Sequence, residues 1–256
     1  MSDPAVARGT SDSIVVVQAV PARSEAEPSG VQQAVIDLER HGDVYVLRVD
    51  EGENRFVPGT IAAWHSALDE VEKAAAPKAL VTVGSGKFYS NGLDLEYGSK
   101  SGDMNGYVSS VLAIMKRVLV FPAYTVAAVN GHAFGAGAQI ALAHDARVMR
   151  TGRGFFCMPE IDMKAFLHPG MTAIIQARLP HQSAHELIVT GMRYPAERAL
   201  ERKIVDRIVS EEELLPTAIA MAAEFAAKAD PIMHVLKRDM YPRVLAALDQ
   251  KLAPPG

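Results

Sequence analysis

Two glycine-bearing turns, each following a largely apolar run, are the features of this sequence that most constrain its fold. Residues 79–83 and 124–129 have the length and composition of buried strands, and residues 86–94 and 130–137 follow them as turns. Glycine in such a turn lets backbone N–H groups point at a ligand instead of at a neighbouring strand. Two turns of this kind can direct two N–H groups at one oxygen atom, which is how proteins stabilise an enolate or another oxyanion.

The rest of the sequence alternates between runs with strand character and runs with helical spacing. We expect a β-hairpin over residues 34–49, and a helix over residues 60–75 that is capped by Thr60 and stopped by Pro77. Further predicted elements are helices at residues 107–120 and 136–144 and short strands at residues 147–149 and 154–157. This alternation is typical of an α/β fold with a largely parallel sheet.

Neither an internal repeat nor a second type of composition divides the chain. Residues 1–32 are rich in Ser, Pro, Ala and Glu without sustained periodicity, and we expect them to form a flexible N-terminal leader. Residues 33–200 are expected to form the core, and residues 201–256 a helical C-terminal region. In that region Ser210 and Glu213 have the spacing of a capping box, and Asp230-Pro231 is a typical helix start.

Composition excludes several classes of protein. With 49% hydrophobic and 22% charged residues the chain is an ordinary globular sequence. Lys and Arg are scattered singly at a net charge of −4, so nothing favours nucleic acid or an anionic membrane as a partner. No apolar run approaches the roughly 18 residues of a membrane span. The single cysteine, Cys157, excludes an internal disulfide framework and fits a reducing compartment, so we expect a cytoplasmic protein.

Each chemical motif also has a plainer interpretation. Gly, Ser and Asn favour turns for conformational reasons alone, and the small residues at 135–137 can serve only to pack a helix against a strand. Glu160, which follows a proline, can be a solvated surface acid. What favours a catalytic site is the combination: two glycine turns in order, followed by Met158-Pro159-Glu160, whose carboxylate could act as a base.

These segments resemble a known family. Residues 86–95, residues 130–143 with Asp145, and residues 156–161 are similar to the signature segments of the crotonase, or enoyl-CoA hydratase/isomerase, superfamily, and the likeness extends through most of residues 34–230. Within the superfamily, residues 87–95 most resemble the Δ3,Δ2-enoyl-CoA isomerases, including the plant peroxisomal type. The resemblance implies a crotonase-type ββα spiral core with a helical C-terminal region. It also implies a homotrimer or dimer of trimers.

The same resemblance assigns the binding site residue by residue. It implies an oxyanion hole made by the backbone N–H groups of Leu93 and Ala136, the second of them at a helix N-terminus, where the helix dipole adds positive potential. The substrate is expected to be an acyl-CoA, so that coenzyme A arrives with the substrate and neither a metal nor a separate cofactor is needed. The implied substrate-binding residues are Asn91, Gly92, Leu93, Asp94, Leu95, Gly135 and Ala136.

The carboxylates indicate which reaction to expect. Hydratases of this family use two glutamates, and the matching positions here are Gln139 and Glu160. An amide cannot accept a proton from water, which impairs two-carboxylate water addition, whereas one base is enough to move a double bond. We therefore predict that Glu160 takes a proton from C2 of a 3-enoyl thioester and returns it at C4. The apolar neighbours Phe156 and Met158 should raise the pKa of Glu160.

Several alternatives stay open at this point. Asp162 is a rival base, because in an extended backbone it would point to the same side as Glu160. Asp94 fits better as an acceptor that orders its loop. Arg55, Lys237 and Arg238 are weak candidates for contacts with coenzyme A phosphates, and a solvated helix face explains the last two equally well. The protein could instead be a hydratase or a thioester hydrolase of the same family, or a non-catalytic acyl-CoA-binding protein.

Overall fold

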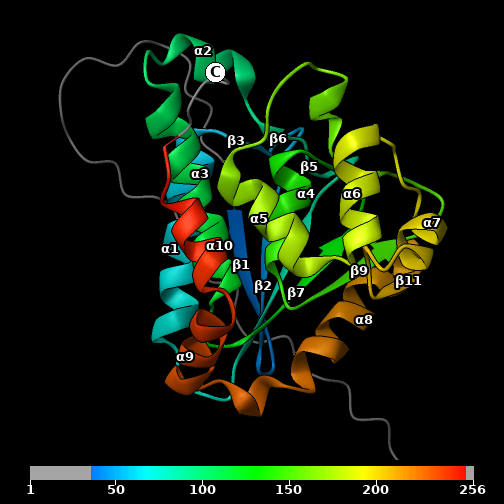
Figure 1. Cartoon of the computed structure of the whole chain (residues 1–256). Coiled ribbons are helices and arrows are strands. Elements are labelled where there is room, and N and C mark those ends of the chain that lie inside the picture. The colour runs from blue at the N-terminus through cyan, green and yellow to red at the C-terminus, as the bar shows by residue number, and fades with distance from the viewer. Residues whose placement is uncertain (1–35, 252–256) are drawn as a thin grey trace, which may run out of the picture.

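A computed structural model describes residues 36–251, so the predicted leader at residues 1–32 lies outside the described part. The largest sheet has the order β1-β2-β4-β7-β9-β11. Its first two strands form the expected antiparallel hairpin, and every later pair of neighbours is parallel. The strands are β1 (Ile36–His41), β2 (Val44–Val49), β4 (Ala79–Gly84), β7 (Tyr124–Val129), β9 (Ala146–Arg150) and β11 (Arg207–Val209). Figure 1 shows this sheet in the middle of the molecule, flanked by helices.

Two smaller sheets follow the ends of the long strands. One has the order β10-β8-β5 and the other pairs β3 with β6, and all of these neighbours are parallel. Along the chain a long strand, a short strand and a helix recur, which is the ββα repeat expected from the sequence. The short strands are β3 (Arg55–Phe56), β5 (Phe88–Ser90), β6 (Gly92–Leu93), β8 (His132–Phe134) and β10 (Phe156–Cys157).

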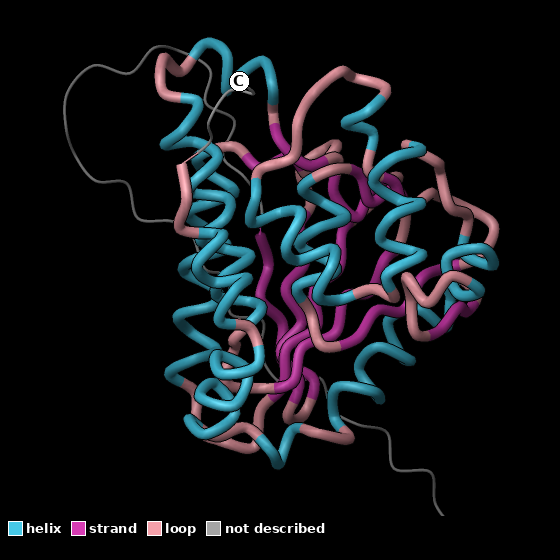
Figure 2. The backbone as a smooth tube through the Cα atoms, in the orientation of Figure 1, coloured by secondary structure: helices cyan, strands magenta, loops and turns pink. Residues whose placement is uncertain are grey.

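The helices surround the sheets (Figure 2). In the first half of the chain they are α1 (Pro58–Lys73), α2 (Leu95–Lys100), α3 (Met104–Leu119) and α4 (Ala136–Ala143). In the second half they are the 3-10 helix η1 (Pro159–Ile161), α5 (Pro169–Arg178), α6 (His181–Thr190), α7 (Ala196–Glu201), α8 (Glu211–Ala223), the 3-10 helix η2 (Ala226–Lys228), α9 (Pro231–Met240) and α10 (Pro242–Leu248). Among residues 36–251, no helix is both long and apolar enough to cross a bilayer.

The two faces of the large sheet pack against different helices. Because side chains alternate along a strand, Val81 and its neighbours on one face of β4 pack against α8, where Leu214 and Ala218 are buried. Leu80 faces the opposite side and belongs to the larger cluster, which includes Ile140 of α4. Both faces are therefore covered, as a parallel sheet requires. Helix α4 is consequently buried along its whole length, and its N-terminus lies inside the fold.

Most of the predicted elements are present, and the differences have local causes. Helix α1 begins at Pro58 rather than being capped by Thr60, whose hydroxyl instead donates to Glu51 Oε2. The short helix α2 was not predicted, because its six residues are fewer than a periodicity can define. The Ser210–Glu213 capping box and the Asp230 cap are both present. The C-terminal region is not wholly helical, since β11 extends the large sheet.

Lys237 has a structural role that differs from the one its sequence position suggested. Its ammonium group is buried and donates to Asp145 Oδ2 at 2.6 Å and to the carbonyl oxygens of Phe121 and Ala123 at 3.1 and 3.0 Å. A cation with three internal acceptors is committed to the fold, so the assignment of Lys237 to a coenzyme A phosphate is wrong. Arg238 lies on the exposed side of α9 and pairs with Asp239.

Candidate active site

The two glycine turns meet at Gly92. This residue has φ +80°, and a Cβ atom added to it would lie 2.7 Å from Phe134 O and 3.0 Å from Ala136 N. Any side chain at this position would therefore collide with the backbone of the second turn. Glycine is required here for two reasons, the left-handed backbone and the close approach of two chain segments.

Gly137 makes a second close contact between the turns. A Cβ atom at Gly137 would overlap the carbonyl oxygen of Ser90, which lies in the first turn two residues before Gly92. The N-terminal end of α4 is thus packed directly on the backbone of the segment that carries Gly92. Residues far apart in the sequence are held against each other by contact between backbone atoms.

The N-terminus of α4 presents an unused donor. Ala136 is its first residue, so its N–H has no acceptor within the helix, and none of the hydrogen bonds among residues 36–251 involves it. The preceding Gly135 has φ +50°, and its own N–H donates to Cys157 O at 3.0 Å. The helix dipole gives this end of α4 a partial positive charge, so the N–H of Ala136 lies in a position suited to an anionic oxygen.

The first turn is held by hydrogen bonds to Asn54 and Arg55, which precede α1 in the sequence. Ser90 Oγ accepts from the N–H of Gly92 at 3.1 Å and donates to Asn54 O at 2.7 Å. Arg55 donates through Nη1 to Leu93 O at 3.1 Å, and it also pairs with Glu53. Arg55 is therefore engaged in holding the turn, a role that the sequence did not reveal.

Asp94 and Tyr107 complete this anchoring. The Asp94 carboxylate accepts from the N–H of Tyr97 at the start of α2, which confirms its interpretation as a loop-ordering acceptor. The N–H of Asp94 donates to the hydroxyl of Tyr107, and that hydroxyl donates to Phe56 O. Tyr107 thus joins α3 to both strands of the β3–β6 pair, while Leu95 begins α2 and is 45% exposed.

Glu160 lies beside the second turn. It belongs to η1, and a Cβ atom at Gly135 would lie 3.5 Å from Glu160 Oε1. The other carboxylate oxygen, Oε2, is buried and has no hydrogen-bond partner among residues 36–251. Burial raises the pKa of Glu160 above its ordinary value, as its apolar neighbours predict, while a hydrogen bond from its own backbone opposes the shift. A carboxylate with these properties is suited to accept a proton.

The rival carboxylate and the matching amide are placed differently. Asp162 is exposed and lies against Gly191, and the backbone between it and Glu160 is a 3-10 turn instead of the extended chain that would have aligned the two. Gln139 is fully buried on α4, and its Nε2 lies 3.5 Å from Met158 Sδ. Its Oε1 has no partner within the described chain. The site therefore has one buried carboxylate, from Glu160.

Other candidate groups belong to the scaffold. Cys157 is buried, its thiol lies 3.3 Å from Gly191 O, and burial raises its pKa to about 11, so it is not a nucleophile. His168 caps α5 through Nδ1, which accepts from the N–H of Gly170. Within residues 36–251, no group of three or more His, Cys, Asp or Glu side chains is arranged to hold a metal ion.

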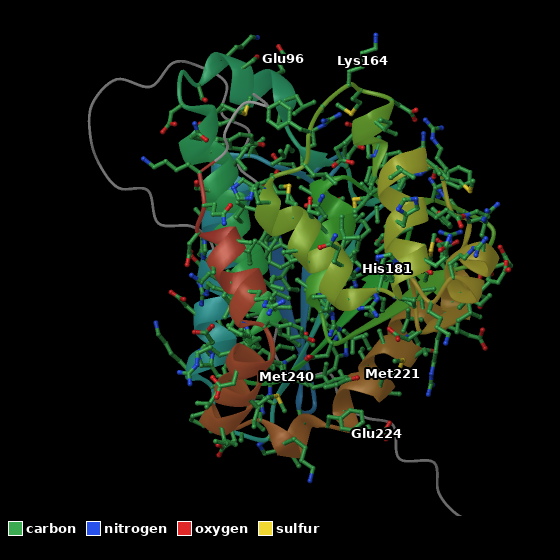
Figure 3. The ribbon with its side chains drawn as sticks, in the orientation of Figure 1. Glu96, Lys164, His181, Met221, Glu224 and Met240 are labelled. Atoms are coloured by element: carbon green, nitrogen blue, oxygen red, sulfur yellow. The ribbon has the colours of Figure 1, made fainter. Side chains whose placement is uncertain are left out.

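The segments that follow Asp94 and Glu160 lie at one end of the molecule. Figure 3 places Glu96, just after Asp94, and Lys164, just after the Glu160 turn, at the same end, while Met221 and Glu224 of the α8 region lie at the other. Exposed apolar side chains flank this end on both segments, namely Leu95, Tyr97, Ile161, Met163 and Phe166. The geometry brings together a donor at a helix N-terminus, a neighbouring glycine turn and a buried carboxylate.

Comparison with known proteins shows which proteins this chain is similar to. Residues 39–253 match the family described as enoyl-CoA hydratase/isomerase. "Enoyl-CoA delta isomerase 2, peroxisomal" of Arabidopsis thaliana is 33% identical over 225 residues, which cover 82% of this chain and 94% of the relative. Enoyl-CoA delta isomerase 3 of the same plant is 31% identical over 224 residues, covering 83% and 94%. A carnitinyl-CoA dehydratase of Salmonella enteritidis is 27% identical over 205 residues, covering 79% and 78%.

Solved structures show the same fold. The human mitochondrial delta3-delta2-enoyl-CoA isomerase superposes with a TM-score of 0.77 at 21% identity, covering 85% of this chain and 86% of that one. A protein of Mycobacterium tuberculosis also gives 0.77 at 22% identity in two structures, one described as an enoyl-CoA isomerase (covering 83% and 93%) and one as a probable enoyl-CoA hydratase (covering 83% and 91%). These likenesses confirm the crotonase-type spiral that the sequence motifs predicted.

The contact at Gly92 predicts a large difference between two glycine substitutions in the same turn. Gly92→Ala should lower the free energy of unfolding by about 2 kcal/mol more than Gly86→Ala, since it adds a clash to the left-handed strain that both share. At Gly86, φ is +61° but nothing lies within 4 Å of an added Cβ atom. Urea unfolding of the two variants measures the difference, and equal losses would show that the turns are not in contact.

The raised pKa of Glu160 predicts a pH-dependent gain in stability for Glu160→Gln. The folded protein holds this proton more tightly than the unfolded chain, whose value is 4.5, so the stability of the wild type falls as pH rises from 4.5 through the folded pKa. The Glu160→Gln variant has no carboxyl group to ionise at this position, so its stability does not fall for this reason. Urea unfolding should therefore show a larger advantage for the variant at roughly pH 8 than at roughly pH 5. An advantage that is the same at both pH values would contradict the raised pKa.

Proposed function

The chain belongs to the enoyl-CoA hydratase/isomerase family, and on that premise we propose that it is a Δ3,Δ2-enoyl-CoA isomerase. It converts 3-enoyl-CoA to 2-enoyl-CoA by moving the double bond into conjugation with the thioester carbonyl. The single observation that carries this proposal is one buried carboxylate, Glu160, beside the junction of the two glycine turns, with an uncharged Gln139 at the position of a second. The relatives named as isomerases support it at 31–33% identity.

The thioester oxygen binds between the backbone N–H groups of Leu93 and Ala136. When a proton leaves C2, negative charge develops on this oxygen and a dienolate forms. Support comes from the contact between Gly92 and the Ala136 backbone and from the unused N–H at the start of α4. One such donor typically contributes about 3 kcal/mol to transition-state stabilisation. Because only backbone atoms act, leucine and alanine are suitable at these positions.

Glu160 transfers the proton. Its carboxylate takes a proton from C2, becomes a neutral acid while the dienolate exists, and returns the proton at C4. Burial disfavours the ionised form and so narrows the gap in acidity between the carboxyl group and the C–H bond. The unpartnered Oε2 supports this role, because no internal donor holds the carboxylate away from the substrate among the described residues.

Gln139 favours isomerisation over hydration. Water addition in this family uses a second carboxylate, and an amide in its place can neither take a proton from water nor become charged. The Gln139 side chain is enclosed next to Met158, which leaves Glu160 as the one group suited to proton transfer at this junction of the described chain.

Substrate binding follows from the same segments. Asn91, Gly92, Asp94, Leu95 and Gly135 surround the thioester and the adjoining pantetheine, and coenzyme A enters only as part of the substrate. No metal or further cofactor takes part in the proposed reaction. A cytoplasmic location stays a prediction, since "Enoyl-CoA delta isomerase 2, peroxisomal" of Arabidopsis thaliana carries another location in its name.

A homotrimer or dimer of trimers is part of the proposal. Supporting it, α9 carries an apolar stripe at four-residue spacing whose members Ile232, Leu236 and Met240 are 55%, 58% and 68% exposed. Burying such a stripe against another copy would remove apolar surface from water. Sedimentation equilibrium of the full chain should give three or six copies, and Leu236→Glu should lower this number. A monomeric wild type would contradict the assembly.

The catalytic role of Glu160 predicts a large loss of activity on a minimal change. Glu160→Gln should reduce kcat for conversion of a 3-enoyl-CoA to the conjugated product by about 10²–10⁴-fold, because the base is removed while the shape is kept. The increase in ultraviolet absorbance of the conjugated thioester measures the rate. Asp162→Asn is the matched control and should retain wild-type activity.

Products separate this proposal from its alternatives. A hydratase would convert 2-enoyl-CoA to a hydroxyacyl thioester, a hydrolase would release free coenzyme A thiol, and a binding protein would take up acyl-CoA without turnover. Incubating the wild type with 3-enoyl and 2-enoyl thioesters distinguishes all four. Conjugated product from the 3-enoyl substrate supports the isomerase, and hydroxyacyl product alone would overturn it.

A further inference from the structure

Three buried polar side chains form a hydrogen-bonded series that joins the first turn to α4, the helix that follows the second turn. Tyr89 of β5, Thr82 of β4 and His144 at the end of α4 are each at least 96% buried. Thr82 Oγ1 lies 2.8 Å from the Tyr89 hydroxyl and 2.9 Å from His144 Nε2. His144 Nδ1 lies 2.8 Å from Ile140 O, within α4 itself. The proposed reaction uses none of these groups.

The direction of each hydrogen bond in the series Tyr89–Thr82–His144 follows from the acceptor at its His144 end. The carbonyl of Ile140 can only accept, so His144 Nδ1 carries a proton. Burial lowers the pKa of His144 to about 3, which keeps the ring neutral and leaves Nε2 as an acceptor. Thr82 must then donate its one proton to Nε2, and Tyr89 must donate to Thr82. All donors of the series are satisfied, and only one arrangement of its protons satisfies them.

The two ends of this series lie on the two segments that carry the proposed oxyanion-hole amides, with His144 at the opposite end of α4 from Ala136. Tyr89 directly precedes Ser90, whose hydroxyl holds the N–H of Gly92. His144 is bonded to α4, whose first residue is Ala136. Thr82 lies between them on β4, a central strand of the large sheet. The hydrogen bonds therefore connect both amide-bearing segments to one fixed point.

A small pocket lies beside these three side chains. Its lining includes Asn54, Thr82, Tyr89, Ser90 and Ile140. Well-packed interiors resist small shifts because neighbouring atoms block them, but a cavity removes that resistance on one side. The directional hydrogen bonds of Thr82 add a constraint to the packing beside this pocket.

We propose that Thr82 is a positioning residue, which through Tyr89 and His144 sets the separation of the Leu93 and Ala136 amides in the oxyanion hole. The inference rests on the proposed function, since it assumes that these amides bind the thioester oxygen. It acts through the geometry of the hole and not through contact with substrate. Loss of the Thr82 hydroxyl should therefore weaken polarisation of the thioester carbonyl while leaving coenzyme A binding largely intact.

Two substitutions at the same position separate the hydroxyl from the shape of the side chain. Thr82→Val keeps the branched shape and removes the hydroxyl, whereas Thr82→Ser keeps the hydroxyl and removes a methyl group. Tyr89→Phe removes only the hydrogen bond between the Tyr89 hydroxyl and Thr82. Ser183→Ala is the remote control, because it removes another buried hydroxyl that donates to Arg202 O between α6 and α7.

Kinetics provide the first readout. Thr82→Val should lower kcat for the 3-enoyl-CoA about 10–100-fold with less than about a threefold change in KM, as expected when donors are misplaced without loss of substrate contacts. Thr82→Ser and Ser183→Ala should remain within about threefold of the wild type. A general loss of stability would affect Thr82→Val and Ser183→Ala alike, so the contrast between them isolates the oxyanion hole.

Infrared spectroscopy provides a second readout that needs no turnover. The carbonyl stretch of a saturated acyl-CoA labelled with ¹³C at the carbonyl should move to lower frequency on binding to the wild type. This shift should be smaller in Thr82→Val and Tyr89→Phe, and retained in Thr82→Ser and Ser183→Ala. If Thr82→Val does not fold, the comparison of Tyr89→Phe with Ser183→Ala decides.

The outcomes distinguish the inference from the function on which it rests. No shift in the wild type would remove the oxyanion hole itself, and the positioning role with it. A shift in the wild type that persists unchanged in Thr82→Val, or in Tyr89→Phe where that variant decides, would overturn the positioning role alone. Loss of the shift with loss of the hydroxyl, and its retention in Thr82→Ser, is the result we expect.

Discussion

The approach of Gly92 to the backbone of Ala136 is the contact on which the rest of this site depends. It places two turns from different ββα units within van der Waals distance, and a Cβ atom at Gly92 would lie 3.0 Å from Ala136 N. Backbone groups held in this way need no side-chain reorganisation when charge develops on a substrate, which is the main advantage of a preorganised oxyanion hole. In the proposed reaction the Glu160 carboxylate can act as the base because it lies beside the same junction.

The scaffold produces this contact through the parallel order of its strands. β4, β7 and β9 are neighbours in the large sheet, so the segments that follow them, carrying Gly92, Ala136 and Glu160, lie on the same side of the molecule. The short strands β5, β8 and β10 pair in turn and carry this order outward. Helix α4 is buried and contacts strands of all three sheets, which keeps its N-terminus fixed where an anion would bind.

The sequence predicted most of the elements because they depend on local patterns, whereas the site residues assigned from the family resemblance stay a prediction. Strand β7 was predicted with its observed bounds, since an apolar run between turn signals is a local property. The supporting contacts could not be predicted. Tyr107 reaches Phe56, Arg55 reaches Leu93, and Thr82 reaches His144 across long stretches of chain, and no periodicity or spacing encodes such pairs. The wrong assignment of Lys237 has the same origin, because its partner Asp145 lies on another element.

A structure with a bound, unreactive 3-enoyl-CoA analogue tests the central claim most directly. We expect the thioester oxygen to lie within hydrogen-bond distance of the N–H groups of both Leu93 and Ala136. We expect one carboxylate oxygen of Glu160 to lie within reach of both C2 and C4 of the acyl chain. A thioester oxygen bound away from the junction of the two turns, or a Glu160 carboxylate that reaches neither carbon, would contradict the account.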